Sequence, residues 1–209
     1  MAIKKTAGAP VEIKALDIRT VDVPIVGVSE LIVHNWSEKA KRQMLDKQMK
    51  NVKTKKEAKD PQADYESSIY KFTDGRHGFP AGGFKAAIVG ACRLFDGLPM
   101  TQAKIAIMVN GTDGSELVEI KGNPYMREDM VRLESGVADI RYRAAYPEWK
   151  ATLNITFNAG MLSIEQLINL VNGAGFGGIG EWRPSAPKTA SGSFGRFKVA
   201  VSVEDIENA

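Results

Sequence analysis

The stretch FPAGGFKAAIVGACRLFDG, residues 79–97, decides the fold. Pro80 is suited to open a helix, residues 84–95 are apolar enough to be buried, and Gly97 is suited to end the helix. We therefore expect a core helix here that packs against a sheet.

A second stretch with the same character lies far along the chain. SIEQLINLVNGAGF, residues 163–176, has Ser163 in the N-cap position, Glu165 in the first turn and glycine near its close. The sequence therefore predicts a pair of well-separated core helices, each followed by strand-like sequence.

The first strand-like segment precedes both helices. Residues 11–36 are β-branched and partly alternating, and they are interrupted by Pro24, as in two strands or one bent strand. We expect the first sheet strand to end near His34.

Further strands follow the first core helix. Residues 101–122 predict two strands joined by a glycine-rich turn, and residues 138–158 predict a hairpin that reverses near residues 146–148. Residues 194–206 predict a last strand. The resulting order is βαββαβ, which indicates an α+β protein with a ferredoxin-like or RRM-like core.

We expect one domain over residues 1–209 that carries a hairpin insertion and a basic helical insertion at residues 37–76. The insertion opens with SEKAKRQMLDKQMKNVKTKKEAKDP, in which Ser37 takes the N-cap position and Asp60-Pro61 stops the helix. Its few apolar residues are too sparse for a core-facing stripe, which predicts a helix that is exposed or becomes ordered on binding.

The charge of this insertion has two interpretations. A run of charge is usually solvated surface, but a lysine-rich element also neutralises a polyanion whatever its base sequence. The second interpretation, which we favour, assigns contacts to Lys41, Arg42, Lys50 and Lys53.

The overall charge balance excludes a strongly basic protein. The chain has 28 Lys plus Arg against 25 Asp plus Glu, a formal net charge of +3, so a nucleic-acid surface must come from clustering of charge. Cys92 is the one cysteine and stands in an apolar stretch, which predicts a buried thiol and excludes an internal disulfide or a CxxC metal pair. We find no signal-peptide pattern and no long apolar run, and expect a soluble cytoplasmic protein with no membrane partner.

Catalytic motifs are scarce. His34 and His77 are the only histidines, and neither stands in an H-x-E or HExxH pattern or beside a cysteine. GFGGIG resembles a dinucleotide motif, but Glu-Trp-Arg-Pro follows it where a helix would be needed. We therefore expect no cofactor, no metal site and no enzymatic activity.

A glycine-rich stretch near the end, GFGGIGEWRPSAPKTASGSFGRFKVAV at residues 175–201, suggests a phosphate-binding loop. Arg183, Lys188 and Arg196 lie in or beside it, and a surface loop gains little from ordering several cations without an anion. Trp182 and Phe194 could stack on bases, a contribution of roughly 1–3 kcal/mol per base, or pin the loop to the core, which is the better interpretation of Phe194.

Arg141 and Arg143 alternate with apolar and aromatic residues, so they share one face of a strand. That face is either exposed surface or the floor of a nucleic-acid groove.

Segments of the chain resemble the RAMP (repeat-associated mysterious protein) superfamily. GFPAGGFKAAIVGACRLF, residues 78–95, is similar to the segment that opens the first core helix of that family, and residues 177–198 are similar to its glycine-rich loop. Matching or near-matching places are held by Pro80, Gly82, Lys85 and Arg93 in the first segment, while Gly82-Gly83 replaces the usual double serine.

Within the superfamily the chain most resembles the backbone subunit of CRISPR effector complexes, which polymerises head to tail along guide RNA. The resemblance implies that both segments lie against a nucleic-acid backbone, that a thumb hairpin separates groups of bases, and that the source is a prokaryotic cell or a phage-infected host. It implies backbone contacts for Lys85 and for the glycine-rich loop that contains Gly178, Gly180, Arg183, Lys188 and Arg196, and it leaves the alternatives for Trp182, Arg141 and Arg143 as stated above.

We expect a non-catalytic protein that binds single-stranded RNA or DNA independently of sequence and forms a homo-oligomer or filament along it. Two alternatives stay open: a RAMP-type RNA endonuclease that uses His34, His77 or an aspartate, and a structural subunit whose insertion docks on a protein partner. Neither Asp64 nor Asp74 aligns with the aspartate with which some RAMP proteins cut RNA.

Overall fold

The computed structural model describes residues 15–36, 38–50, 58–132, 136–187 and 190–200. Its main sheet is antiparallel with the strand order β10-β1-β9-β5. The strands are β1 (Ile18–Gly27), β5 (Ile107–Asn110), β9 (Lys150–Asn158) and β10 (Phe197–Val199).

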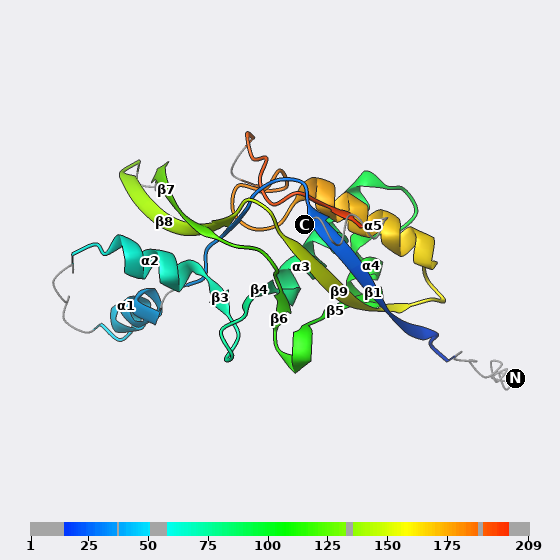
Figure 1. The fold of residues 1–209 in the computed structure, drawn as a ribbon. Helices are drawn as coiled ribbons and strands as arrows, with labels where there is room; N and C mark the ends of the chain where they lie inside the picture. The colour runs from blue at the N-terminus through cyan, green and yellow to red at the C-terminus, as the bar shows by residue number, and fades with distance from the viewer. Residues whose placement is uncertain (1–14, 37, 51–57, 133–135, 188–189, 201–209) are drawn as a thin grey trace, which may run out of the picture.

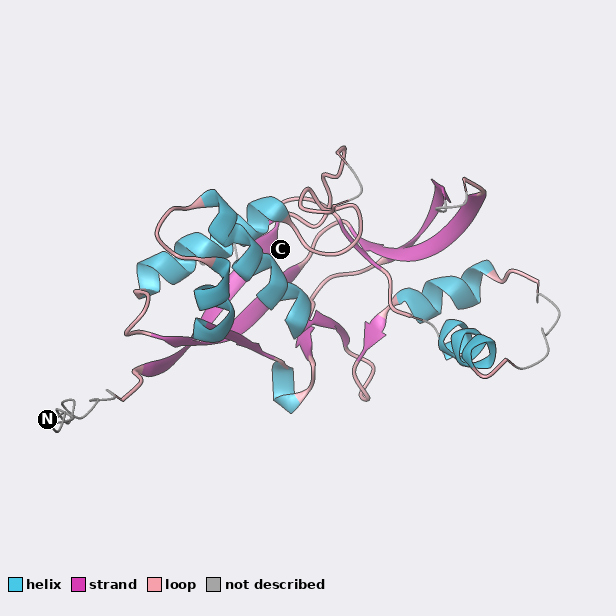
Figure 2. Cartoon of the chain, turned by 180° about the vertical axis from the view of Figure 1, so that it is seen from behind, coloured by secondary structure: helices cyan, strands magenta, loops and turns pink. Residues whose placement is uncertain are grey.

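Helices cover one face of this sheet, as Figure 2 shows. They are α3 (Ala81–Ala91), continued by the short 3-10 helix η1 (Cys92–Leu94), then α4 (Met100–Ala106) and α5 (Ile164–Gly177). Along the chain α3 lies between β1 and β5, and α5 lies between β9 and β10.

The alternation of the long strands explains this layering. On β9, Leu153, Ile155 and Phe157 are buried under the helices. Asn154 and Thr156 point the other way and bond to neighbouring strands, with Asn154 Nδ2 donating to Asp22 Oδ1 at 2.7 Å. The uncovered face is thus a polar, hydrogen-bonded surface.

Local sequence signals fix the ends of α5. The Ser163 Oγ accepts from the Gln166 amide at 3.3 Å, and the Gln166 side chain accepts from the Ser163 amide at 2.8 Å, which completes a capping box. Gly178 ends the helix with φ of +71°.

A second sheet leads away from the main body, with the order β2-β8-β7. It contains β2 (Leu31–Val33), β7 (Tyr125–Arg132) and β8 (Ala138–Tyr146), and β7 and β8 form a hairpin that projects outward beside α1 (Glu38–Gln48) and α2 (Pro61–Ser68) (Figure 1). A small third sheet joins β3 (Tyr70–Lys71), β4 (His77–Pro80) and β6 (Leu117–Glu119), and the 3-10 turn η2 (Thr112–Gly114) precedes β6.

A buried serine fixes α2 against the hairpin. The Ser68 hydroxyl, 2% exposed, donates to the Tyr65 carbonyl oxygen at 2.6 Å and accepts from the Ala144 amide of β8 at 2.8 Å. The projecting elements are therefore joined by specific contacts at their base.

The α+β class, both core helices and the buried Cys92 are confirmed. Residues 11–36 do contain two strands, β1 and β2, but the break between them does not lie at Pro24, because β1 runs through Pro24 and pairs with β9 along its length. The Pro24 carbonyl oxygen still accepts a hydrogen bond from the Ala200 amide at 2.9 Å. Because proline has no N–H, only one hydrogen bond at the end of β10 is lost.

The extent of the basic helix was also predicted wrongly. Helix α1 ends at Gln48, and Asp60-Pro61 begins α2 instead of stopping a helix, because the Asp60 carboxylate accepts from the Ala63 amide at 3.1 Å as an N-cap. Ser37 and Lys53 lie outside the described residues. The boundaries of the insertion at residues 37–76 stay a prediction.

Pairing of the later strands differs from the predicted hairpins. Residues 100–106 form helix α4, and β5 and β6 belong to different sheets. Strands β8 and β9 follow one another closely in sequence but do not pair with each other. Strand β8 pairs with β7 and β2, and strand β9 pairs with β1 and β5. Within the described part of the chain, no helix is long and apolar enough to cross a membrane.

Candidate nucleic-acid interface

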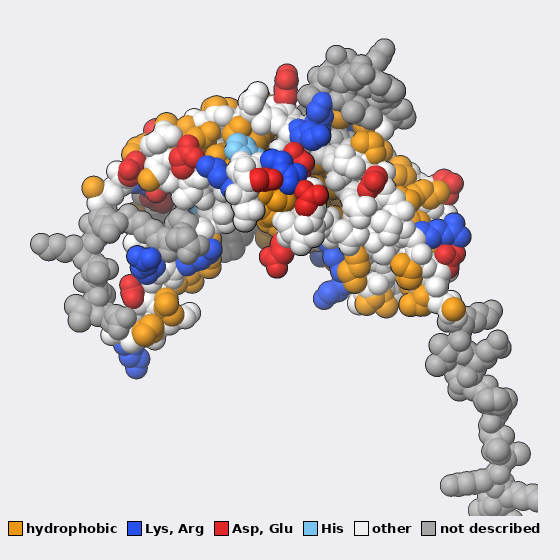
Figure 3. Space-filling view, turned by 60° about the horizontal axis from the view of Figure 1, so that its bottom comes forward, with side chains coloured by type: hydrophobic (Ala, Val, Ile, Leu, Met, Phe, Trp, Pro, Cys, Tyr) orange, Lys and Arg blue, Asp and Glu red, His pale blue; other side chains and the backbone are white. Residues whose placement is uncertain are grey.

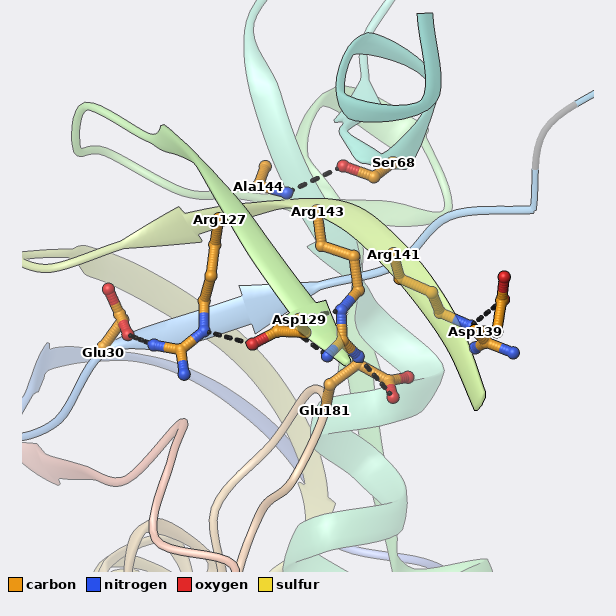
Figure 4. Close-up of polar contacts among 9 residues, drawn as sticks. All are labelled: Glu30, Ser68, Arg127, Asp129, Asp139, Arg141, Arg143, Ala144 and Glu181. Carbon is orange, nitrogen blue, oxygen red and sulfur yellow. Dashed lines mark hydrogen bonds and ion pairs between the residues drawn. The ribbon is translucent and has the colours of Figure 1, made fainter. Parts of the chain in front are cut away.

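A cluster of ion pairs holds the base of the β7–β8 hairpin (Figure 4). The Arg143 guanidinium donates to the Asp129 carboxylate at 2.7 Å and to Glu181 at 3.2 Å. Arg127 joins the same Asp129 at 2.9 Å and Glu30 at 2.7 Å. We call these residues the hairpin-base cluster.

Burial makes the pairing in this cluster necessary. The Arg143 side chain is 1% exposed and that of Asp129 is 4% exposed, so neither charge has water to solvate it. A buried charge without its partner is strongly destabilising, typically by about 3–5 kcal/mol. The cluster joins the loop before β2, the hairpin and the segment after α5 into one unit.

Aromatic rings extend the cluster into the Gly-rich loop, which we define as residues 178–195. The Arg143 guanidinium lies 4.5 Å from the centroid of the Trp182 ring, and Arg127 lies 4.8 Å from that of Phe194. The Trp182 and Phe194 rings are 6.1 Å apart, and Trp182 has a φ of +50°. Cation–π contacts of this kind fix the loop against the hairpin.

The glycines of the loop are explained by the packing of its own backbone. A Cβ on Gly180 would lie 2.5 Å from the Ile32 carbonyl oxygen, and one on Gly195 would overlap that of Ile179. Both residues have positive φ, as does Gly178. Packing of the backbone therefore accounts for these three glycines, and the phosphate contact expected of the loop stays a prediction.

A cavity of about 590 Å³ opens beside this loop. Its floor is made of small residues on α3 and α5, including Gly83, Ala87, Gly90 and Ala174. Residues 177–185 form another wall, so the cavity lies where the segments that resemble the RAMP superfamily meet.

Two arginines from distant parts of the chain line the cavity. Arg93 is exposed at the end of α3 and its side chain makes no ion pair or hydrogen bond with the described residues. Arg183 donates from Nη1 to the Gly180 carbonyl oxygen at 2.8 Å, which leaves its other N–H groups available. The cavity is thus bordered by cations that have donors to offer to an anion.

His34 also lines the cavity. Burial lowers the pKa of its imidazole, so the ring is neutral near pH 7. Its Nδ1 atom is buried and has no hydrogen-bond partner among the described residues. With no acceptor at Nδ1, the tautomer that carries its proton on Nε2 is favoured.

The predicted site residues are only partly brought together. The cavity is lined by Gly178, Gly180 and Arg183. Trp182 instead packs against Arg143 of the hairpin-base cluster. Arg143 was expected on an exposed strand face or a groove floor, but it is buried because Asp129 and Glu181 neutralise it. It therefore presents no cation on the surface.

Other predicted contacts lie elsewhere. Lys85 is two residues beyond Gly83, which lines the cavity, and so lies roughly 200° around the helix from it. Its Nζ lies 2.9 Å from Met108 Sδ, on the side away from the cavity. Arg141 lies farther out on β8 and pairs with Asp139 at 3.5 Å, and Arg196 does not line the cavity. Lys41, Arg42 and Lys50 lie on or next to α1, while Lys188 and Lys53 lie outside the described residues.

The surface carries both signs of charge in close proximity. Figure 3 shows acidic side chains next to basic ones at the centre of the face it presents. Arg76 has three acidic partners: it lies 2.7 Å from Asp74, 2.6 Å from Asp113 and 3.1 Å from Glu119. Its positive charge is therefore neutralised by its neighbours.

The sequence interpretation missed the role of Arg127, Asp129 and Glu181. For Arg127 and Asp129 the signal is the alternation of charge on two strands, since Arg127 lies opposite Arg143 in the register of the hairpin and Asp129 lies opposite Arg141. Glu181 comes from the loop and has no such signal. His77 Nδ1 and the Tyr146 hydroxyl share a partly buried hydrogen bond of 3.1 Å. Among the described residues, no group of His, Cys, Asp and Glu is arranged to hold a metal ion.

Comparison with solved structures finds proteins of similar fold. The chain is similar to the crystal structure of Cmr6 from Pyrococcus furiosus, with 9% sequence identity and a TM-score of 0.42 over 89% of this chain and 100% of that one. No protein-family model and no curated protein sequence matches the chain. A likeness of this degree assigns neither a family nor a function.

Proposed function

We propose that the protein binds single-stranded nucleic acid, RNA or DNA, through contacts to the phosphate backbone. The observation that carries the proposal is the pair Arg93 and Arg183 at one cavity, each with donors that the described residues do not occupy. Arginine is well suited to phosphate because its planar fork of donors matches the phosphate oxygens.

The position of the cavity supports the same proposal. It lies between α3 and the Gly-rich loop, beside a projecting hairpin whose base is fixed to that loop. We assign β1, α3, β5, β9, α5 and β10 to a ferredoxin-like core of the RAMP type, on which the hairpin and the helices α1 and α2 are additions. A nucleic-acid strand bound at the cavity would run past the hairpin and the helices α1 and α2.

Contacts of this kind do not read sequence. Phosphate groups are the same at every nucleotide, so the proposed binding is sequence-independent and depends strongly on salt. We further propose that copies of the protein line up head to tail along the strand and that they do not cleave it. Among the described residues, no carboxylate is hydrogen-bonded to the neutral His34 that would orient it as a general base.

The test uses labelled single-stranded RNA, single-stranded DNA and duplexes of equal length at several salt concentrations. The proposal requires that a single strand binds better than a duplex, that affinity falls with salt, and that the strand stays intact. Equal affinity for all, or no binding, contradicts it. Stoichiometry that grows with strand length would support the head-to-tail arrangement, and a constant ratio of one protein per strand would contradict it.

A protein-docking role is the second candidate. Leu94, Phe95 and Phe176 are 56%, 44% and 68% exposed on the helical side of the molecule. Exposed apolar groups of this kind also occur at protein interfaces. This candidate requires assembly without nucleic acid and a weak dependence on salt.

A further inference from the structure

We propose that the cavity between α3, α5 and the Gly-rich loop takes one unstacked nucleobase of the bound strand, and that Arg93 and Arg183 hold the phosphates next to it. The inference rests on the proposed function and adds a base-binding subsite to it. Its volume, about 590 Å³, lies in the range of small-molecule sites.

The walls of the cavity suit a flat aromatic ring. On α3 the side that faces the cavity carries Gly83, Ala87 and Gly90, which leave the helix surface low and even. A Cβ built on Gly90 meets no atom of the described part of the chain within 4 Å, so the space above this glycine is open there. A base can approach the helix closely there.

An aromatic side chain stands at the edge of this space. Phe176, near the end of α5, lines the cavity and is nevertheless 68% exposed. A phenylalanine that is so exposed gains little from the protein's own core, whereas stacking on a base would cover it. We therefore assign the stacking contact to Phe176, and the small residues of α3 leave room for the base beside it.

Polar groups in the cavity match the edge of a base. Glu181 lines it, with a carboxylate that is 40% exposed and that engages Arg143 through Oε2 at 3.2 Å. The remaining Oε1 is an acceptor for an exocyclic amine or ring N–H, and the Ser185 hydroxyl both donates and accepts. These donors and acceptors can pair with the edge of more than one kind of base, which agrees with binding that is independent of sequence.

Two glycine variants of α3 provide a matched test. Gly90→Leu fills the cavity, and Gly82→Leu places the same side chain on the same helix at a position that also meets no atom within 4 Å but does not line the cavity. Phe176→Ala is a second variant that removes the stacking partner from an exposed position. Each is compared with the wild-type chain after its fold has been checked by circular dichroism.

The probes are a single strand that carries 2-aminopurine at successive positions and an abasic strand of equal length. We expect Gly90→Leu and Phe176→Ala to weaken binding of the base-bearing strand at least about fivefold, the lower end expected for removal of one stacked base, and to abolish the fluorescence change of 2-aminopurine. Gly82→Leu should behave as wild type, and the abasic strand should bind all four proteins equally.

The subsite is contradicted if wild type binds the strand but Gly90→Leu and Gly82→Leu bind it equally well, a result that leaves phosphate binding intact. It is contradicted as well if the abasic strand binds wild type as tightly as the base-bearing strand. Failure of wild type to bind any strand overturns both the subsite and the proposed function.

Discussion

The Arg143 guanidinium, 1% exposed, lies 2.7 Å from the Asp129 carboxylate on the neighbouring strand of the hairpin. The same guanidinium reaches Glu181 and the Trp182 ring in the Gly-rich loop. The orientation of the projecting hairpin is therefore fixed by the loop that borders the cavity, through the buried Arg143 and the half-exposed Glu181.

Arg143→Ala should lower the free energy of unfolding by about 3–5 kcal/mol, because it leaves the buried Asp129 charge without its partner. Urea denaturation measures this decrease. Arg141→Ala is the matched control, since its pair with Asp139 is longer, at 3.5 Å, and more exposed, and its removal should change stability by no more than about 0.5 kcal/mol. Equal decreases for the two variants would show that the cluster is not what holds the hairpin base.

Gly195→Ala should destabilise the protein more than Gly136→Ala. Both glycines have positive φ, which costs an alanine about 1–2 kcal/mol. Only Gly195 also places the new Cβ against backbone, at the Ile179 carbonyl oxygen, whereas a Cβ on Gly136 meets no atom of the described residues within 4 Å, and overpacking adds about 1–3 kcal/mol. The difference in unfolding free energy between the variants isolates the steric part, and a difference near zero contradicts the close approach.

Stability should fall as the pH is lowered through the ordinary pKa of histidine. Burial lowers the pKa of His34 below 6.5, so the unfolded chain takes up a proton before the folded one does. The stabilisation by neutral His34 is complete above the unfolded pKa and is lost as the pH falls toward the folded one. His34→Gln should reduce this loss of stability between about pH 7.5 and pH 5.5.

Urea unfolding of wild type and His34→Gln at both pH values checks this prediction. Burial also lowers the pKa of His77, so His77→Gln serves as the parallel variant that separates the two histidines. An identical decrease of stability in wild type and His34→Gln would place the titrating group elsewhere.

The cations on and next to α1 should contribute to affinity if the helix lies along the bound strand. Replacing Arg42 and Lys50 with glutamine should weaken binding of all sequences alike. It should also lower the slope of log affinity against log salt by about 0.7 for each phosphate that is no longer neutralised. Lys104→Gln on α4 removes a single exposed charge of the same sign and is the control. No change in the α1 variant would identify its charge as ordinary solvated surface.

Much of the core could be predicted from the sequence because its signals are local. Ser163, Gln166 and Gly178 mark the ends of α5 by chemistry that acts within one turn of a helix. The pairing of β8 and β9 could not be predicted in this way, because strand order depends on distant segments: β2 and β7 take the edges of β8, and β1 and β5 take those of β9.

The candidate site was harder to predict for a related reason. Alternation in sequence places Arg141 and Arg143 on one face, but it does not say what covers that face. The Gly-rich loop, which comes from almost 40 residues farther along the chain, covers Arg143 with Glu181 and Trp182 and leaves Arg141 more exposed. Composition likewise suggested that the loop glycines serve a ligand, but it could not show that the backbone at Gly180 and Gly195 closely approaches Ile32 and Ile179.

The central claim, that the protein holds a nucleic-acid backbone at the cavity, is tested most directly by the salt dependence of single-strand binding in Arg93→Gln, with Arg196→Gln as control. Arg93 lines the cavity and Arg196 does not. We predict that Arg93→Gln weakens binding of every sequence alike and lowers the slope of log affinity against log salt by about 0.7, while Arg196→Gln matches wild type. Equal affinity and slope in wild type and Arg93→Gln would contradict the account.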